Sequence, residues 1–199
     1  MIITDFLEKN AKLYPSEVSL VEVNPANQPD RNVTWREYSL IETSSKGKYR
    51  REMTWKEFDT KANRFANLLL TRGIQKGDKV AILLMNCLEW LPIYFGILKT
   101  GAIAVPMNYR YTADEIKYCL DLAEVKTLIF GPEFTERIEQ VLSQLGNIKS
   151  FFFVGSDKPG FADSYDKLSL YCSSTAPAVD LQERDDAAIY FSSGTTGFP

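Results

Sequence analysis

The stretch "KVAILLMNCLEWLPIYFGILKTGAIAVP", residues 79–106, decides the fold. It opens with "KVAILL" and closes with "AIAVP", two short apolar runs of the kind found in strands buried on both faces. Between them an apolar stripe recurs at helical spacing, formed by Trp90, Ile93, Tyr94, Ile97 and Leu98. Pro92 fits the first turn of a helix that begins near Glu89, and Gly101 can end that helix. Strand, helix and strand in this order predict a parallel crossover unit.

The same rhythm continues after residue 106. The runs "KTLIF" and "SFFFV" predict two more buried strands, each preceded by a segment of helical period. Thr112 and Glu115 form a capping box at the start of one helix, and Pro132 opens the next, which Gly146 can close. We therefore expect an α/β fold, a doubly wound parallel sheet with helices on both faces.

The N-terminal part contains a near-repeat, "TWREY" at 34–38 and "TWKEF" at 54–58, and both copies have the spacing of a capping box. The second copy leads into a helical stripe of Phe58, Ala62, Phe65 and Leu69. The first leads into alternating residues and a turn, so we interpret residues 34–54 as a small β-hairpin elaboration. A short helix at 5–13 and a strand at 18–23 precede it.

Residues 155–186 are polar and contain Gly, Pro and Ser, which is typical of a connection between subdomains. We place a boundary near 175–185 and divide the chain into three parts. Residues 1–77 hold the N-terminal helix, the strands and hairpin and the first long helix; residues 78–180 form a βαβ subdomain; residues 181–199 begin a second subdomain. The run "AAIYF" at 187–191 is predicted to open a second sheet.

Composition excludes several classes of function. The chain has 199 residues, a formal net charge of -3 and interspersed charges, which argues against nucleic-acid binding. It has no histidine, so catalytic triads and histidine–zinc sites are excluded within it. The three cysteines are widely spaced, which favours reduced thiols in a cytoplasmic protein. The N-terminal segment is acidic where a signal peptide would be basic. No apolar stretch is long enough for a transmembrane segment. Cys87 could lie near a helix start and be activated there, although a buried thiol is the simpler interpretation.

The C-terminal stretch "SSGTTGFP", residues 192–199, has the composition of a phosphate-binding loop. Glycine permits backbone conformations that point N–H groups at an anion, and serine and threonine add hydroxyl donors. A flexible linker or an ordinary hairpin turn has the same composition. The spacing differs from that of the G-x-x-x-x-G-K-[ST] loop, and no lysine follows within the chain.

The stretch "YFSSGTTGFP" resembles the signature loop of the adenylate-forming (AMP-binding) superfamily, which comprises acyl-CoA synthetases, aryl-CoA ligases, luciferases and peptide-synthetase adenylation domains. The resemblance extends along residues 54–120 and through "RDDAAIYF", and only residues 24–50 depart from the pattern. The segment "VPMNYRYTADEI" is more similar to acyl-CoA and aryl-CoA ligases than to peptide-synthetase domains, because Asn108 and Arg110 stand where the latter have an acidic residue and a proline.

The resemblance implies the N-terminal portion of an ATP-dependent acyl-CoA synthetase, which uses ATP, Mg2+, a carboxylic acid and CoA. It assigns nucleotide binding to the loop positions Ser192, Ser193, Gly194, Thr195, Thr196 and Gly197. No catalytic or metal-binding residue is assigned, because the family's other site residues would lie after residue 199. We expect this chain alone to be inactive and capable of self-association. An amino-acid adenylation domain and a non-catalytic scaffold protein are the alternatives.

Overall fold

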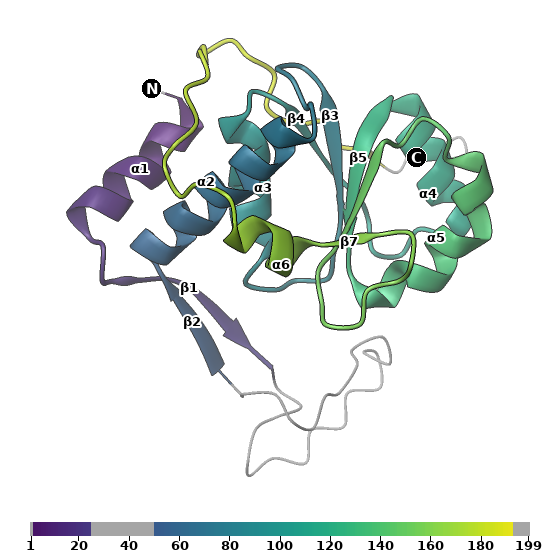
Figure 1. The fold of residues 1–199 in the computed structure, drawn as a ribbon, viewed down its shortest axis with the longest axis horizontal. Helices are drawn as coiled ribbons and strands as arrows, with labels where there is room; N and C mark the ends of the chain where they lie inside the picture. The colour runs from purple at the N-terminus through teal and green to yellow at the C-terminus, as the bar shows by residue number, and fades with distance from the viewer. Residues whose placement is uncertain (1, 25–49, 193–199) are drawn as a thin grey trace.

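The computed structural model describes residues 2–24 and 50–192. A five-stranded parallel sheet forms its centre, in the order β4-β3-β5-β6-β7 (Figure 1). These strands are β3 (Lys79–Leu83), β4 (Ile103–Pro106), β5 (Val125–Phe130), β6 (Ser150–Phe153) and β7 (Asp163–Ser164). The chain winds outward from β3 in both directions, so β3 and β5 enclose the point where the strand order reverses. The predicted doubly wound α/β fold is confirmed.

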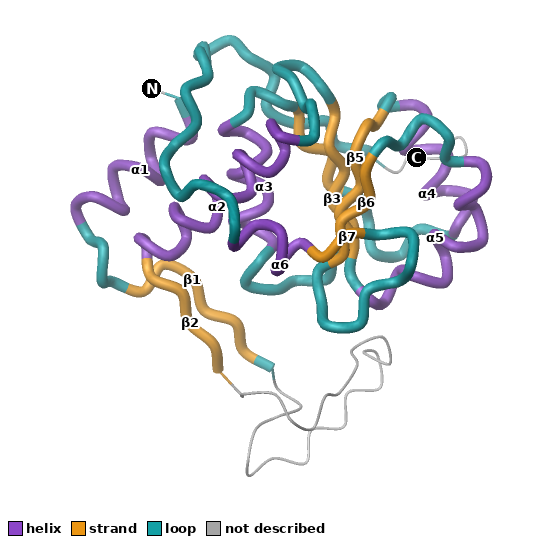
Figure 2. The backbone as a smooth tube through the Cα atoms, viewed as in Figure 1, coloured by secondary structure: helices purple, strands orange, loops and turns teal. Residues whose placement is uncertain are grey.

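Helices cover both faces of the sheet, as the edge-on view in Figure 2 shows. The helices α2 (Trp55–Thr71), α3 (Trp90–Lys99) and α6 (Tyr165–Leu170) lie on one side, and α4 (Ala113–Leu122) and α5 (Thr135–Val141) on the other. Each layer buries its own apolar cluster against the sheet, with Phe65, Ile93 and Phe152 on one side and Ile116, Phe130 and Ile138 on the other. Both faces of the sheet are thus buried, which explains why the strands predicted from the sequence are continuous apolar runs.

The N-terminal elements pack outside the α2–α3 layer. Helix α1 (Ile3–Leu13) is followed by β1 (Val18–Val23), which pairs antiparallel with β2 (Arg50–Thr54). The predicted strand at 18–23 and the predicted small N-terminal β-hairpin are confirmed, but the bounds of the hairpin, predicted as 34–54, are corrected. Residues 50–54 pair with β1, whose sequence lies far upstream, while residues 34–49 and the "TWREY" copy lie outside the described residues.

Local sequence signals place the helix ends. Thr54 and Glu57 form a reciprocal capping box, in which the Thr54 hydroxyl accepts from the Glu57 N–H at 3.2 Å and the Glu57 carboxylate accepts from the Thr54 N–H at 2.8 Å. Thr112 and Glu115 repeat this arrangement at α4. Gly101 follows α3 with φ +72°, a conformation that favours glycine. These helix ends were predicted, and the structure confirms them.

The structure corrects two predictions about the second half of the chain. The helix predicted from Pro132 is divided into η2 (Pro132–Phe134), α5 and η3 (Leu142–Gln144), although its apolar face is buried as expected. The run at 187–191 does not open a separate sheet within the described residues. Ala188 instead forms a parallel bridge with Ala104 of β4, so the segment adds to the β4 edge of the five-stranded sheet. The subdomain boundary near 175–185 stays a prediction.

Candidate functional site

The segment 187–192 is the approach to the predicted phosphate loop, and β4 holds it in place. The Ala104 N–H donates to the Ala187 carbonyl at 3.0 Å, and the Ile189 N–H donates to the Ala104 carbonyl at 2.9 Å. These two bonds make the segment parallel to β4, so its end points to the carboxyl edge of the sheet. Ligands of open α/β folds bind at this edge.

Side chains of the approach segment alternate between the two faces of the sheet. Ile189 and Phe191 pack against the apolar cluster on the α4–α5 side, whereas Ala188 packs against the cluster on the α2–α3 side. The Tyr190 hydroxyl lies 3.3 Å from the Tyr94 hydroxyl of α3. Alternation over these four residues is the pattern of a strand between two helical layers.

Of the six predicted loop residues, the structure describes Ser192, which is exposed at the end of the approach segment. The positions Ser193, Gly194, Thr195, Thr196 and Gly197 lie outside the described residues. The structure therefore fixes where the loop starts, at the carboxyl edge beside the end of β4. The assignment of the six residues to nucleotide binding stays a prediction.

The turn after β4 lies beside this site. Arg137 of α5 donates to the carbonyls of Tyr109 and Tyr111, both at 2.8 Å, and so fixes the backbone of the turn. The Asn108 side chain accepts from the Arg110 N–H at 3.0 Å, which closes the turn locally. Burial raises the pKa of Tyr111 to about 12, so its phenol stays protonated at neutral pH.

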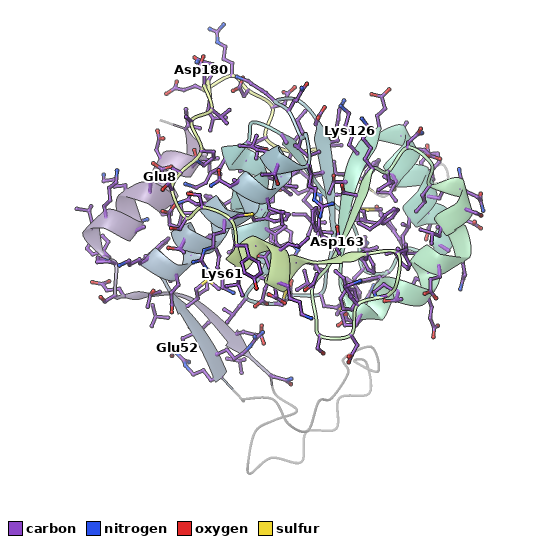
Figure 3. All side chains as sticks on the ribbon, in the orientation of Figure 1. Glu8, Glu52, Lys61, Lys126, Asp163 and Asp180 are labelled. Atoms are coloured by element: carbon purple, nitrogen blue, oxygen red, sulfur yellow. The ribbon has the colours of Figure 1, made fainter. Side chains whose placement is uncertain are left out.

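The connection that leads to the approach segment is held along its length. Asn67 donates to the carbonyls of Ser173 and Thr175 at 2.9 Å, and Lys76 donates to the carbonyl of Asp180 at 2.9 Å. Lys76 also forms an ion pair of 2.6 Å with Asp185. Asp180 lies where the connection passes over the end of the molecule near the N-terminus (Figure 3). The connection thus delivers residue 187 to a defined place beside β4.

A cleft of about 280 Å³ lies at the carboxyl edge where the strand order reverses. Arg51, Glu89 and Asp166 contribute side chains to it, together with the ends of β3, β5 and β6. Arg51 pairs with Glu22 at 2.6 Å and lies 3.7 Å from Glu89. Burial and the Glu89 charge raise the pKa of Asp166. Within the cleft, Arg51 thus faces the Glu89 carboxylate, while its closest partner, Glu22, lies outside the cleft lining.

Cys87 lies in the same cleft, at the end of β3. Burial and the neighbouring Glu89 charge raise the pKa of its thiol to about 12. A thiol with such a pKa is protonated at neutral pH and is a poor nucleophile. The hypothesis of an activated Cys87 is wrong, and the simpler interpretation of a buried thiol holds in part, because the side chain is half-buried.

Two kinds of feature do not occur in the part of the chain that the structure describes. Residues 2–24 and 50–192 contain no group of three or more His, Cys, Asp or Glu side chains placed to hold a metal ion. In the same part of the chain, no helix combines the length and the apolar character that crossing a membrane requires.

Sequence reasoning missed the side chains that position the site, among them Tyr94, Arg137, Asn67 and Lys76. Each acts on a backbone or side chain far away in the sequence. No local pattern marks such contacts, because motif spacing reports only on neighbours along the chain.

Comparison with known proteins identifies the family. Residues 8–199 match the family model described as AMP-binding enzyme. A medium/long-chain-fatty-acid–CoA/3-oxocholest-4-en-26-oate–CoA ligase of Mycobacterium marinum is 34% identical over 153 residues, which cover 71% of this chain and 27% of the relative. Long-chain-fatty-acid–CoA ligase FadD13 of Mycobacterium tuberculosis is 34% identical over 144 residues, covering 69% of this chain and 26% of the relative.

Comparison with solved structures indicates the same family. The anthranilate CoA ligase AuaEII, solved with anthranoyl-AMP, superposes with a TM-score of 0.82 at 26% identity and covers all of this chain and 33% of that one. The N-terminal domain of FACL13 from Mycobacterium tuberculosis gives a TM-score of 0.77 at 27% identity, covering all of this chain and 42% of that domain. The chain spans about a quarter of the length of the curated relatives it matches. By sequence and by fold, the chain belongs to the AMP-binding enzyme family.

Proposed function

We propose that the chain is the N-terminal portion of an AMP-forming acyl-CoA ligase, and that residues 192–197 bind the phosphates of ATP. One observation carries the proposal: a loop of serine, threonine and glycine directly follows a segment bound to β4, at the carboxyl edge of a doubly wound sheet. This edge is where such folds bind ligands. Family membership supports the same assignment.

The donor set of the loop fits a polyanion. The hydroxyls of Ser192, Ser193, Thr195 and Thr196 can donate to phosphate oxygens. Gly194 and Gly197 lack side chains, so the backbone N–H groups at these positions can approach the same oxygens closely. The loop has no carboxylate that would repel the nucleotide.

The proposed reaction has two steps. In the first, a carboxylate oxygen of the acid attacks the α-phosphorus of ATP, the bond to the bridging oxygen of the β-phosphate breaks, and pyrophosphate leaves. In the second, the thiolate sulfur of CoA attacks the acyl carbon, and AMP leaves with the electron pair of the broken C–O bond. The contribution of this chain is to hold the β- and γ-phosphates and offset their charge, which orients the α-phosphorus for attack.

Mg2+ would arrive with the phosphates of the nucleotide, whose oxygens are its preferred ligands, and would offset their charge. The hydroxyls of the loop are the residues of this chain that fit such a complex. The substrate class that we propose is a fatty or aromatic carboxylic acid. The ligases named above act on medium- and long-chain fatty acids, on 3-oxocholest-4-en-26-oate and on anthranilate. Location in the cytoplasm and self-association of this chain on its own stay predictions.

Carboxylate-dependent exchange of labelled pyrophosphate into ATP tests the proposal. The complete protein that contains this chain is incubated with MgATP and a panel of fatty, aromatic and amino acids, followed by CoA. We expect exchange and thioester formation with at least one fatty or aromatic acid. Exchange with amino acids alone would favour an amino-acid adenylation domain. No exchange with any acid would overturn the proposal in favour of a non-catalytic protein.

A further inference from the structure

The end of the approach segment is held by side chains. Its last backbone bond to β4 is that of the Ile189 N–H, three residues before Ser192. Phe191 is then held by apolar packing on the α4–α5 side. Among the described residues, the polar side-chain contact of Tyr190 is the 3.3 Å approach of its hydroxyl to that of Tyr94. Tyr94 is therefore the polar contact of the segment on the α3 side, and it meets a Tyr190 side chain that is 68% exposed.

Tyr94 is well suited to be a fixed anchor. Its ring stacks on Trp90 with centroids 5.4 Å apart and planes 14° apart, and it meets Phe95 edge-on at 6.2 Å. Neighbouring residues Ile93 and Ile97 of α3 are fully buried in the layer beneath. Burial and the hydrogen bond to Tyr190 raise the pKa of Tyr94, so its hydroxyl keeps its proton at neutral pH. The contact thus comes from a helix that is packed against the sheet through Ile93 and Ile97.

The contact also selects the register of the segment. Successive side chains of a strand point to opposite faces, so a slip of one residue would move Tyr190 away from α3 and expose Ile189 and Phe191 to the wrong layer. Ser192 lies two residues beyond Tyr190, about 7 Å further along an extended chain. The position of Tyr190 therefore determines where Ser192 lies at the start of the loop.

We propose that Tyr94 is a positioning residue of the nucleotide site, which holds the approach segment in register through the Tyr190 hydroxyl and so sets where Ser192 lies at the carboxyl edge of the sheet. This inference rests on the proposed function of the loop. It assigns a role to α3, which the loop motif itself does not include.

The first test uses the complete enzyme and the variant Tyr94→Phe, which removes the hydroxyl and keeps the ring on Trp90. Loss of one hydrogen bond predicts that KM for MgATP rises about two- to tenfold. We expect kcat to change less than twofold, because the bond is made equally before and during reaction. Tyr190→Phe should give the same rise, and the double variant should be no worse than either single variant. Tyr171→Phe, at a tyrosine that is 90% exposed, is the matched control and should leave KM unchanged.

The second test does not depend on catalysis. In this 199-residue chain, Tyr94→Phe should speed amide hydrogen exchange of Ile189, whose N–H bonds to β4, at least threefold. Exchange of Met107, whose N–H bonds to the Ile82 carbonyl, should stay the same. Unchanged exchange at Ile189, unchanged KM in Tyr94→Phe or additive effects in the double variant would each overturn the inference. If the wild-type enzyme shows no ATP chemistry, the nucleotide role falls with the proposed function, and Ile189 exchange alone decides the anchoring contact.

Discussion

Lys99 places an ammonium group in the interior, where three helices meet. Its side chain is 2% exposed, and its Nζ lies 2.8 Å from Glu8 of α1 and 3.0 Å from Asp59 of α2. Glu8 is labelled in Figure 3, on the face of α1 that meets the other helices. A buried charge is tolerated only when it is paired, and Glu8 and Asp59, which are themselves half-buried, both pair with the buried ammonium. Lys99 therefore links α1 and α2 to α3.

Lys99→Ala should lower the free energy of unfolding by about 1–3 kcal/mol, because two half-buried carboxylates lose their hydrogen-bonded partner. Urea denaturation followed by circular dichroism measures this loss. Lys117→Ala is the matched control, since Lys117 forms an exposed pair with Asp121 along α4 and should lose less than about 1 kcal/mol. Equal losses in the two variants would contradict the role of Lys99.

The carboxyl group of Asp78 makes the free energy of unfolding depend on pH. Burial acts to raise the pKa of this carboxyl, but the Lys126 ammonium and the Gln75 N–H outweigh it, and the net pKa is lowered. Lys126 lies at the upper end of the sheet in Figure 3. A lowered folded-state pKa stabilises the protein above the unfolded pKa of about 3.9, and this contribution is lost as pH falls through the folded value.

The difference in unfolding free energy between wild type and Asp78→Asn should thus be constant above about pH 5 and narrow as pH falls below about 4. Urea midpoints between pH 7 and pH 2.5 provide the measurement. A difference that does not vary with pH would show that Asp78 acts through its shape and hydrogen bonds and not through its charge.

At the scale of elements, α2 and α3 approach each other closely at Gly96. A Cβ at this position would lie 3.0 Å from the Ala62 carbonyl oxygen and 2.9 Å from Cδ1 of Phe65. The backbone oxygen cannot move away without moving α2. Gly96 therefore sets the distance between the two helices that cover one face of the sheet.

Gly96→Ala should destabilise the chain by about 1–3 kcal/mol through overpacking, although alanine is the better helix former by about 1 kcal/mol. The thermal midpoint reports the change. Gly146→Ala, where the added methyl would meet no atom within 4 Å, should leave the midpoint unchanged or slightly higher. A Gly96→Ala variant as stable as wild type would mean that the helices can separate freely.

The sequence predicted those elements whose signals are local. Capping boxes at Thr54 and Thr112 identified helix starts, because side chain and backbone partners lie three residues apart. The pairing of Ala188 with Ala104 was not predicted, since nothing in "AAIYF" reveals which strand lies beside it. The two-residue β7 likewise lies in a polar stretch that has no strand pattern.

At the scale of the whole molecule, the candidate site was predictable in part. The composition of the loop after "AAIYF" indicated a phosphate site, but the sequence assigned this run to a second sheet, and only the bridge of Ala188 to Ala104 places it beside β4. The turn held by Arg137 and the connection held by Asn67 and Lys76 were not predictable, because these contacts join parts of the chain that only the fold brings together.

This 199-residue chain should bind MgATP no more tightly than about 1 mM. A handful of hydrogen bonds at about 1 kcal/mol each gives about 5 kcal/mol, and millimolar affinity corresponds to about 4 kcal/mol. The conformational entropy lost when the loop side chains are immobilised on the nucleotide removes part of this gain. Isothermal titration calorimetry measures the affinity, and a micromolar dissociation constant would contradict the expectation.

The most direct test of the account compares loop variants in the complete protein by pyrophosphate exchange. Thr196→Val removes one hydroxyl of the loop at constant shape, and Gly194→Ala adds a methyl where the backbone is expected to approach phosphate. Thr175→Val, at an exposed threonine of the connection, is the control. We predict that kcat/KM for MgATP falls at least tenfold in both loop variants and stays within twofold of wild type in the control. Exchange rates that are the same in all four proteins would contradict the claim that residues 192–197 bind the nucleotide.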